Sequence, residues 1–237
     1  MTAHLYSGKI DWEEIYTVFH SPSKIAEHII RKLDCNDHPL VFSGFAETAA
    51  CLANLIPVTF VDLSPSVTAR TIQNFSTLSR ILTGDVTQLM SSYPTDNVVI
   101  ACRISAYWGS EEFDRFTKSL RSFPRKKVLI DFFDRDVVQP GQRVLFESPI
   151  GGGEWVFLGF EDIEGDMPLI SKAKLNFSYS IRDNSFSYEG DRSFFRKENI
   201  EQWCKAKLSE YRIKISSPLL DSDPSFTLSL THDRLHS

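Results

Sequence analysis

PLVFSGFAETAACLANLIPVTFVDLSPSVTARTIQNFSTLSRILTGDV, residues 39–86, is the stretch that decides the fold. An apolar run at 39–42 leads into a turn around Gly44 and then into a helix-like segment. A second apolar run ends on Asp62, and a third short run is followed by Gly84 and Asp85. Strand, small-residue turn, helix, strand and acid is the order found in sheets that bind a nucleoside.

Three residues of the first turn are candidates for binding a nucleoside-containing cofactor: Ser43, Gly44 and Phe45. Small residues at this point let the backbone approach a ligand closely. The helix that follows presents free backbone N–H groups at its N-terminus. We therefore expect this turn to contact a bound nucleoside.

The ends of the next two strands carry the other candidates from this stretch. The carboxylate of Asp62, next to Leu63, can accept hydrogen bonds from both hydroxyls of a ribose. The alternative is that Asp62 caps the following helix through Ser64. Asp85 and the backbone amide of Val86 are placed to read an adenine edge. Asp85 also fits a simpler role as the cap of the helix that follows.

The chain beyond this stretch repeats the pattern. Apolar runs at 98–102 and 128–134 predict two more strands, and five strand–helix units indicate a Rossmann-like, doubly wound, mostly parallel α/β sheet. The carboxyl ends of such strands bind ligands. Cys102 and Arg103 are therefore candidate cofactor-binding residues, and Tyr107 is a candidate catalytic residue.

The whole chain, 1–237, is interpreted as one domain with four parts. Residues 1–34 predict an N-terminal helical lid, and 35–139 the nucleoside-binding core. Residues 140–191 lack helical periodicity and alternate like strands, with a flexible glycine stretch at 151–153, which predicts a β-rich cap inserted after the fifth strand. Residues 192–237 predict a closing helix and strands. Simple packing of the N-terminal helices on the domain is the alternative to a lid.

Composition narrows the classes of partner. The net charge of −5 argues against a protein that binds nucleic acid through a basic surface. The four cysteines form no CxxC pair, so we expect neither a zinc site nor any other metal, and a reducing compartment fits. No apolar run reaches the length of a membrane span. We expect a cytoplasmic protein, a monomer or homodimer, that binds a small molecule and neither nucleic acid nor membrane.

The segments VTFVDLSP (58–65) and TGDV (83–86) resemble the class I S-adenosylmethionine-dependent methyltransferases. The resemblance implies a Rossmann-like fold and S-adenosylmethionine as co-substrate. In the first turn, Phe42 stands where the family usually has an acid, and the glycine positions are Gly44, Ala46 and Thr48. Because that acid helps to hold the methionine amine in the family, its absence has two interpretations: another residue replaces it, or the fold is degenerate and binds no cofactor. Ser43, Arg103 and Asp131 are the candidates.

Methyl transfer from a sulfonium needs chiefly proximity and alignment. Tyr16, Tyr107 and Tyr179 are the candidate catalytic aromatics around the sulfonium and substrate, with packing as the alternative for each. Asp131 is the candidate proton acceptor. No histidine is assigned, because those at positions 4, 20, 28 and 38 precede the first strand and none is expected at the ligand edge.

Three functions remain open on the sequence. The first is a methyltransferase that acts on a small molecule. The second is a cyclase, similar to azetidine-2-carboxylate synthases, that consumes S-adenosylmethionine and releases methylthioadenosine. The third is a non-catalytic binding protein with a methyltransferase fold. A dinucleotide oxidoreductase is disfavoured because the sequence lacks a Gly-x-Gly-x-x-Gly motif.

Overall fold

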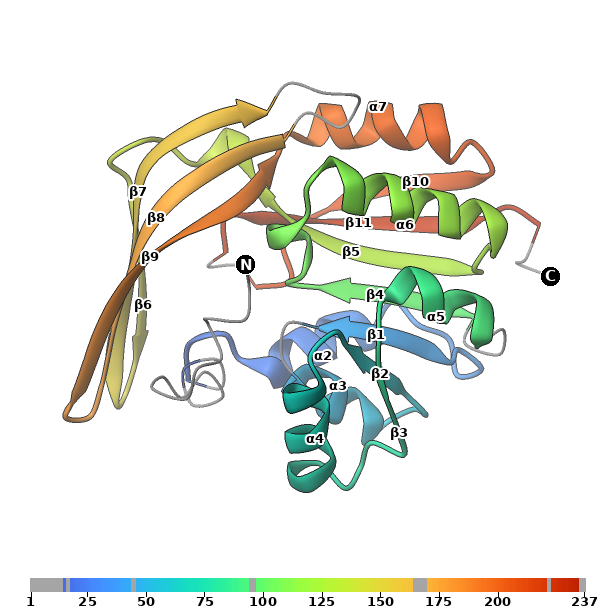
Figure 1. Ribbon diagram of the computed structural model, residues 1–237, viewed down its shortest axis with the longest axis horizontal. Helices are drawn as coiled ribbons and strands as arrows, with labels where there is room; N and C mark the ends of the chain where they lie inside the picture. Colours follow the sequence, from blue (N-terminus) through green and yellow to red (C-terminus); the bar gives the residue numbers. More distant parts are fainter. Residues whose placement is uncertain are drawn as a thin grey trace.

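A single eleven-stranded sheet runs through the protein, as seen in the computed structural model (Figure 1). The structure describes residues 15, 18–43, 46–93, 97–163, 170–220 and 223–234. The strand order is β3-β2-β1-β4-β5-β9-β8-β7-β6, with β11 pairing both β5 and β10. The expected Rossmann-like, mostly parallel α/β core is confirmed.

The parallel part of the sheet contains five strands whose ends lie close to the sequence expectation. They are β1 (Pro39–Ser43), β2 (Thr59–Asp62), β3 (Arg80–Thr83), β4 (Val98–Cys102) and β5 (Lys127–Asp134). Every residue of β1 and β4 is buried, as expected for central strands covered on both faces. β3 lies at the edge and is only partly buried.

Helices cover both faces of this part of the sheet (Figure 1). Side chains of α2 (Pro22–Ile30) and α3 (Ala46–Ala53) pack on one face. Side chains of α5 (Val86–Ser92), α6 (Ser110–Ser122) and α7 (Lys197–Lys207) pack on the other. A further helix, α4 (Pro65–Asn74), connects β2 to β3.

The start of α2 has no side-chain cap. Ser21 occupies the position before the helix, but its side chain makes no capping hydrogen bond. Its backbone is left-handed, with φ of 44°, and its carbonyl accepts the N–H of Ile25 at 3.2 Å. Pro22 therefore begins the helix without a side-chain cap.

The β-rich cap consists of four long antiparallel strands that curl away from the helix-covered core (Figure 1). They are β6 (Arg143–Ser148), β7 (Gly151–Ile163), β8 (Ile170–Ile181) and β9 (Asn184–Phe195). β9 joins the cap to the core by pairing with the end of β5. Alternate residues of β8 from Ala173 to Ile181 are buried in one aromatic cluster, which defines the inner face of the cap.

Gly151, Gly152 and Gly153 form part of strand β7 and not a separate flexible stretch, so that sequence expectation is wrong. A Cβ on Gly151 would lie 2.0 Å from the Ser180 carbonyl oxygen, and one on Gly153 would lie 2.7 Å from the Tyr179 ring. The glycines are needed here because the neighbouring strand approaches closely.

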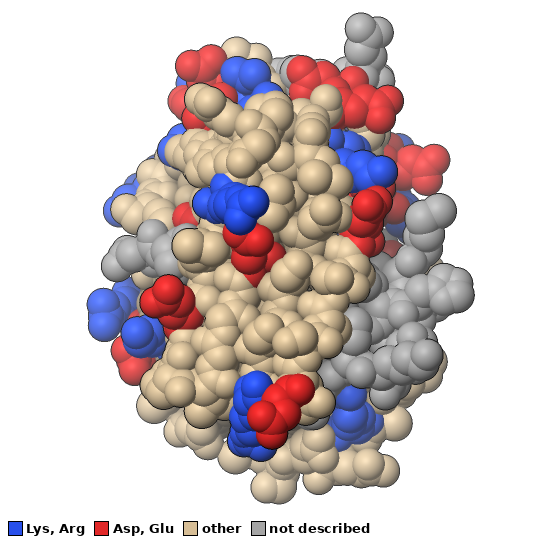
Figure 2. All heavy atoms as spheres, turned by 90° about the vertical axis from the view of Figure 1, so that its left-hand side faces the viewer, with Lys and Arg blue, Asp and Glu red and all other residues tan. Residues whose placement is uncertain are grey.

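The outer face of the cap carries few charged side chains across its middle (Figure 2). Two leucines of the cap strands, Leu145 in β6 and Leu158 in β7, are 62% and 44% exposed. The chain closes with β10 (Tyr211–Ser216) and β11 (Ser225–His232), which runs antiparallel to β5.

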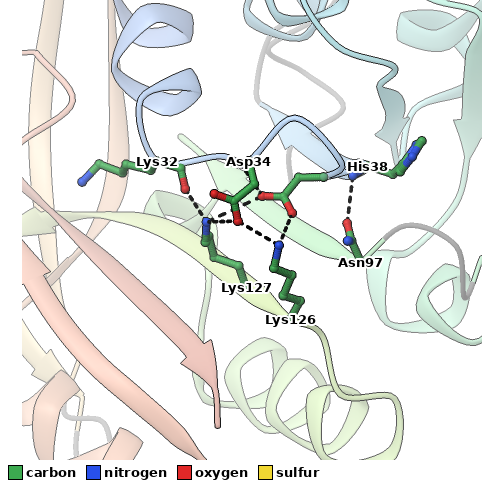
Figure 3. A network of polar contacts seen from close by, with 7 residues as sticks. Lys32, Asp34, His38, Asn97, Lys126 and Lys127 are labelled. Carbon is green, nitrogen blue, oxygen red and sulfur yellow. Dashed lines mark hydrogen bonds and ion pairs between the residues drawn. The ribbon is translucent and has the colours of Figure 1, made fainter. Parts of the chain in front are cut away.

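A polar network ties the connection between α2 and β1 to the start of β5 (Figure 3). The carboxylate of Asp37 is fully buried and pairs with the Lys126 ammonium at 2.9 Å. Asp34, which is half exposed, contacts the same ammonium at 2.8 Å. Together the two carboxylates raise the pKa of Lys126. The network fixes the end of the sheet opposite the expected ligand edge.

Candidate functional site

The carboxyl edge of the parallel strands brings together residues that lie far apart in sequence. Ser43 at the end of β1 pairs in register with Cys102 at the end of β4. Arg103 follows β4, and Asp131 lies in the neighbouring strand β5. Ligands of open α/β sheets bind at this edge, so the structure places these predicted residues where a site would be.

Asp62 ends β2 and keeps part of its carboxylate available. One oxygen, Oδ1, accepts the Ser64 backbone N–H at 2.7 Å, and the Asp62 carbonyl accepts the N–H of Gly84 at 3.0 Å. Burial raises the pKa of Asp62, and the hydrogen bond from Ser64 opposes that effect. In the described part of the chain, no hydrogen bond or ion pair engages Oδ2. That oxygen is available to a ligand hydroxyl.

Helix α4 is capped by Ser64, whose hydroxyl accepts the Val67 N–H at 3.5 Å. Asp62 itself holds the backbone of that capping residue. Its carboxylate therefore contributes to the helix start through Ser64, as the alternative sequence interpretation held, and can still offer its second oxygen to a ribose.

The residues proposed for the adenine are spread over two loops. Leu63 is 70% exposed, so its apolar side chain is open to a flat ring. The Asp85 carboxylate pairs with Arg115 at 3.5 Å, and its carbonyl accepts the N–H of Leu89 at 3.0 Å. The backbone of Val86 begins α5. Their role in adenine binding stays a prediction.

Arg103 is the centre of a buried ionic cluster at this edge. Its backbone is left-handed, with φ of 64°, a conformation that is uncommon outside glycine and concentrates at functional sites. Its N–H donates to Asp131 Oδ1 at 2.7 Å. Its guanidinium pairs with Asp131 Oδ2 at 3.3 Å and with the carboxylate of Asp223.

This cluster changes how two predicted residues are interpreted. Burial raises the pKa of Asp131, and the charge of Arg103 opposes that rise. The Arg103 guanidinium and the Asp131 carboxylate pair with each other, so each of these side chains already has a partner within the protein. Asp223 was not predicted: it lies 120 positions from Arg103, and no local pattern in the sequence points to it.

Cys102 is fully enclosed beside the cluster. Burial raises its pKa well above the usual value, and the nearby Asp131 charge adds to the rise. A hydrogen bond with Ser43 acts in the opposite direction. The side chain is therefore a thiol at neutral pH, and in this state it is a wall of the site and not a nucleophile.

His20 lies near the ligand edge, contrary to the expectation that no histidine would be found there. It is 8% exposed, and its ring centroid lies 5.4 Å from that of Phe146 and 6.0 Å from that of Trp155. Its pKa falls to about 4 because of burial first and then the charge of Arg103, with Asp223 acting in the opposite direction. The segment before α2 therefore carries a neutral imidazole between the cap and the ionic cluster.

The candidate tyrosines occupy different surroundings. Tyr107 lies in the short helix η2 (Ser105–Tyr107) after β4 and is 39% exposed. Tyr179 is 3% exposed in the aromatic core of the cap, and its hydroxyl accepts the Trp155 Nε1–H at 2.7 Å. Burial raises the pKa of Tyr179 to about 12. Tyr107 can meet a ligand at the edge, whereas Tyr179 in this position packs the cap.

Three predicted residues, Tyr16, Gly44 and Phe45, lie outside the described residues. Among the residues that are described, no group of three or more His, Cys, Asp or Glu side chains could hold a metal ion. No helix in the described ranges has both the length and the apolar character needed to cross a membrane.

Solved structures with this fold were found, although no protein-family model and no curated protein matches the sequence. A S-adenosylmethionine-dependent methyltransferase from Clostridium acetobutylicum is 15% identical, with a TM-score of 0.61 over 97% of both chains. DesVI from Streptomyces venezuelae is 10% identical, with a TM-score of 0.63 over 94% of this chain and 97% of that one.

A third similar structure is CalS10 from Micromonospora echinaspora, an amino pentose methyltransferase bound to S-adenosylmethionine. It is 13% identical, with a TM-score of 0.58 over 90% of this chain and 91% of that one. At these identities the likeness concerns the fold. The strand order and these comparisons together identify the fold of this chain as that of the class I S-adenosylmethionine-dependent methyltransferases.

Proposed function

We propose that this protein is a S-adenosylmethionine-dependent methyltransferase that acts on a small molecule. The observation that carries the proposal is the carboxylate of Asp62, half-buried at the end of β2 with one oxygen available. A carboxylate at this position of the fold can accept hydrogen bonds from ribose hydroxyls. Two of the similar structures, CalS10 and the glycopeptide N-methyltransferase MtfA, hold S-adenosylmethionine or S-adenosylhomocysteine.

We assign the residues at the edge to the ribose, the adenine and the methionine end of such a co-substrate. Asp62 would hold the ribose, and the exposed Leu63 would cover one face of the adenine. Ser43 and Cys102 would border the methionine end. Arg103 keeps its guanidinium paired with two carboxylates, so we expect its backbone and the walls of the cluster, and not its charge, to shape that end.

When bound, S-adenosylmethionine supplies an electrophilic methyl group and leaves as S-adenosylhomocysteine. The task of the chain is then to align the acceptor with that methyl group and to exclude water. Tyr107 at the edge and the aromatic inner face of the cap would form the wall around the acceptor. The imidazole of His20, beside the same region, stays neutral, and its pKa of about 4 makes it a weak proton acceptor near neutral pH.

The class of acceptor and the compartment are part of the proposal. CalS10 is described as an amino pentose methyltransferase and MtfA as a glycopeptide N-methyltransferase, which supports a small-molecule acceptor. The cysteines at 35, 51, 102 and 204 form no disulfide with one another, which is consistent with the proposed cytoplasmic, reducing compartment. We propose a monomer or homodimer without nucleic-acid or membrane partners.

The test is calorimetric titration of S-adenosylhomocysteine into the wild type, Asp62→Ala and the control Asp114→Ala. Asp114 is an exposed carboxylate whose ion pair is with Lys118 on the same helix. Loss of hydrogen bonds to a charged acceptor is expected to weaken binding by about ten-fold to a hundred-fold in Asp62→Ala, and the control should bind as the wild type does. Melting curves report any loss of stability separately.

Unchanged affinity in Asp62→Ala would remove the ribose assignment. A wild type that binds no S-adenosylhomocysteine would favour a non-catalytic protein. Product analysis after incubation with S-adenosylmethionine and candidate acceptors completes the test. S-adenosylhomocysteine is expected, and methylthioadenosine in its place would indicate the cyclase reaction.

A further inference from the structure

Arg192 is a buried cation on the inner face of the cap. It lies in β9 and is 8% exposed. Its guanidinium lies over two aromatic rings, 4.7 Å from the centroid of Tyr107 and 4.7 Å from that of Phe177. Tyr107 belongs to the ligand edge of the core, whereas Phe177 belongs to the cap. Arg192 therefore lies at the boundary where an acceptor would enter.

Among the residues that the structure describes, no carboxylate pairs with the guanidinium of Arg192. Within the described part of the chain, its polar contacts are the carbonyl of Asp191, which accepts from Nη1 at 2.9 Å, and the hydroxyl of Tyr188, at 3.5 Å from Nη2. No described carboxylate lies within ion-pair distance of its guanidinium. A buried charge without a counter-charge is costly, so this position requires an explanation.

Arg103 provides an internal comparison. It is also 8% exposed, yet two carboxylates, Asp131 and Asp223, pair with it. Of these two buried arginines, Arg103 is paired with carboxylates, whereas Arg192, among the described residues, contacts two aromatic rings, a carbonyl and a hydroxyl. Aromatic rings occupy the faces of a guanidinium, while its N–H groups project in the plane and remain able to bind a carboxylate or phosphate with two parallel hydrogen bonds.

We propose that Arg192 binds an anionic group, a carboxylate or a phosphate, of the methyl acceptor. This inference rests on the proposed function, because the acceptor role needs the methyl donor at the adjacent edge. Gly190 lets the guanidinium lie close to the backbone of β9: a Cβ there would lie 3.4 Å from Nη1 and 3.4 Å from the Phe177 ring. The aromatic surroundings predict that the anion is attached to an apolar or ring-shaped body.

The experiment titrates benzoate, phenyl phosphate and the uncharged benzamide into the full chain, with and without saturating S-adenosylhomocysteine. The variants are Arg192→Met and the matched control Arg143→Met, whose side chain is 67% exposed in β6 and pairs with Glu154. The wild type and the control should bind one of the anions about ten-fold or more tighter than benzamide. Arg192→Met should lose that difference. Whichever anion binds tighter distinguishes a carboxylate from a phosphate.

A wild type without preference for the anions would overturn the inference, and so would a preference that persists in Arg192→Met. If Arg192→Met does not fold, Arg192→Lys decides. Lysine keeps the charge but lacks the planar fork, so affinity for the anions should fall several-fold while affinity for benzamide stays unchanged. Equal affinities in Arg192→Lys and the wild type would contradict the role.

The two proposals fail in different ways. Loss of anion preference with normal S-adenosylhomocysteine binding would overturn the role of Arg192 alone. Absence of S-adenosylhomocysteine binding in the wild type would overturn the proposed function, and with it the acceptor role of Arg192, whatever the anion titrations give.

Discussion

Lowering the pH from 6.5 to 4 should destabilise this protein through His20. The imidazole is buried, and its pKa falls from the ordinary 6.5 to about 4. Between these values the unfolded chain binds a proton at His20 and the folded chain does not, so the free energy of unfolding falls as the pH falls. A difference of one in pKa corresponds to about 1.36 kcal/mol. The free energy of unfolding should therefore fall by about 3 kcal/mol in total, and the fall is complete below pH 4.

Denaturant unfolding of the wild type and His20→Phe, measured every half pH unit from 7.5 to about 4, isolates this contribution from that of the carboxylates. Phenylalanine keeps a ring against Phe146 and Trp155 but does not titrate. The difference between the two unfolding free energies should therefore shift by about 3 kcal/mol across the range, in favour of the variant at low pH. Two curves that run parallel would show that His20 is not buried beside Arg103, and would refute this arrangement of the segment before α2.

Two further predictions concern packing and the buried ion pair. Gly153→Ala should destabilise the protein by roughly 2 kcal/mol, since its Cβ would lie 2.7 Å from the Tyr179 ring. Gly159→Ala in the same strand, where a Cβ has nothing within 4 Å, is the control, and equal melting temperatures of the two variants would contradict the packing of the cap. Asp37→Asn should lower the unfolding free energy by roughly 2 kcal/mol, because this carboxylate is fully buried. The control Asp34→Asn alters a 55% exposed carboxylate that pairs with the same lysine, so it should lower the unfolding free energy by less than about 1 kcal/mol. A larger loss in Asp34→Asn than in Asp37→Asn would overturn the interpretation of the network.

The parallel core could be predicted from the sequence because its information is local. The apolar run at 98–102 coincides with β4, and the apolar run at 39–42 lies within β1. A central strand is apolar along its whole length, so the run itself marks the element. Asp62 could be placed for the same reason, since it directly follows such a run.

The candidate site could be predicted only in part. Asp62, Cys102 and Arg103 were placed at the edge because they end or follow strands. The three glycines of β7 could not be assigned to a strand from the sequence, because it does not show which backbone approaches them. Tyr179 was named as a candidate for its type, and only the fold shows that it is buried in the cap.

The sequence by itself determined the strands, their order along the chain and the acid at the end of β2, since hydrophobic periodicity and turn residues act over a few positions. Only the tertiary structure decided how the buried charges are balanced. Asp223 reaches Arg103 across 120 positions, His20 enters the ligand edge from a segment before the first strand, and Arg192 lies between Tyr107 and Phe177 without a carboxylate in the described chain. These pairings depend on which surfaces the packed sheet brings together. They matter energetically because the packing excludes the water that would otherwise screen each charge.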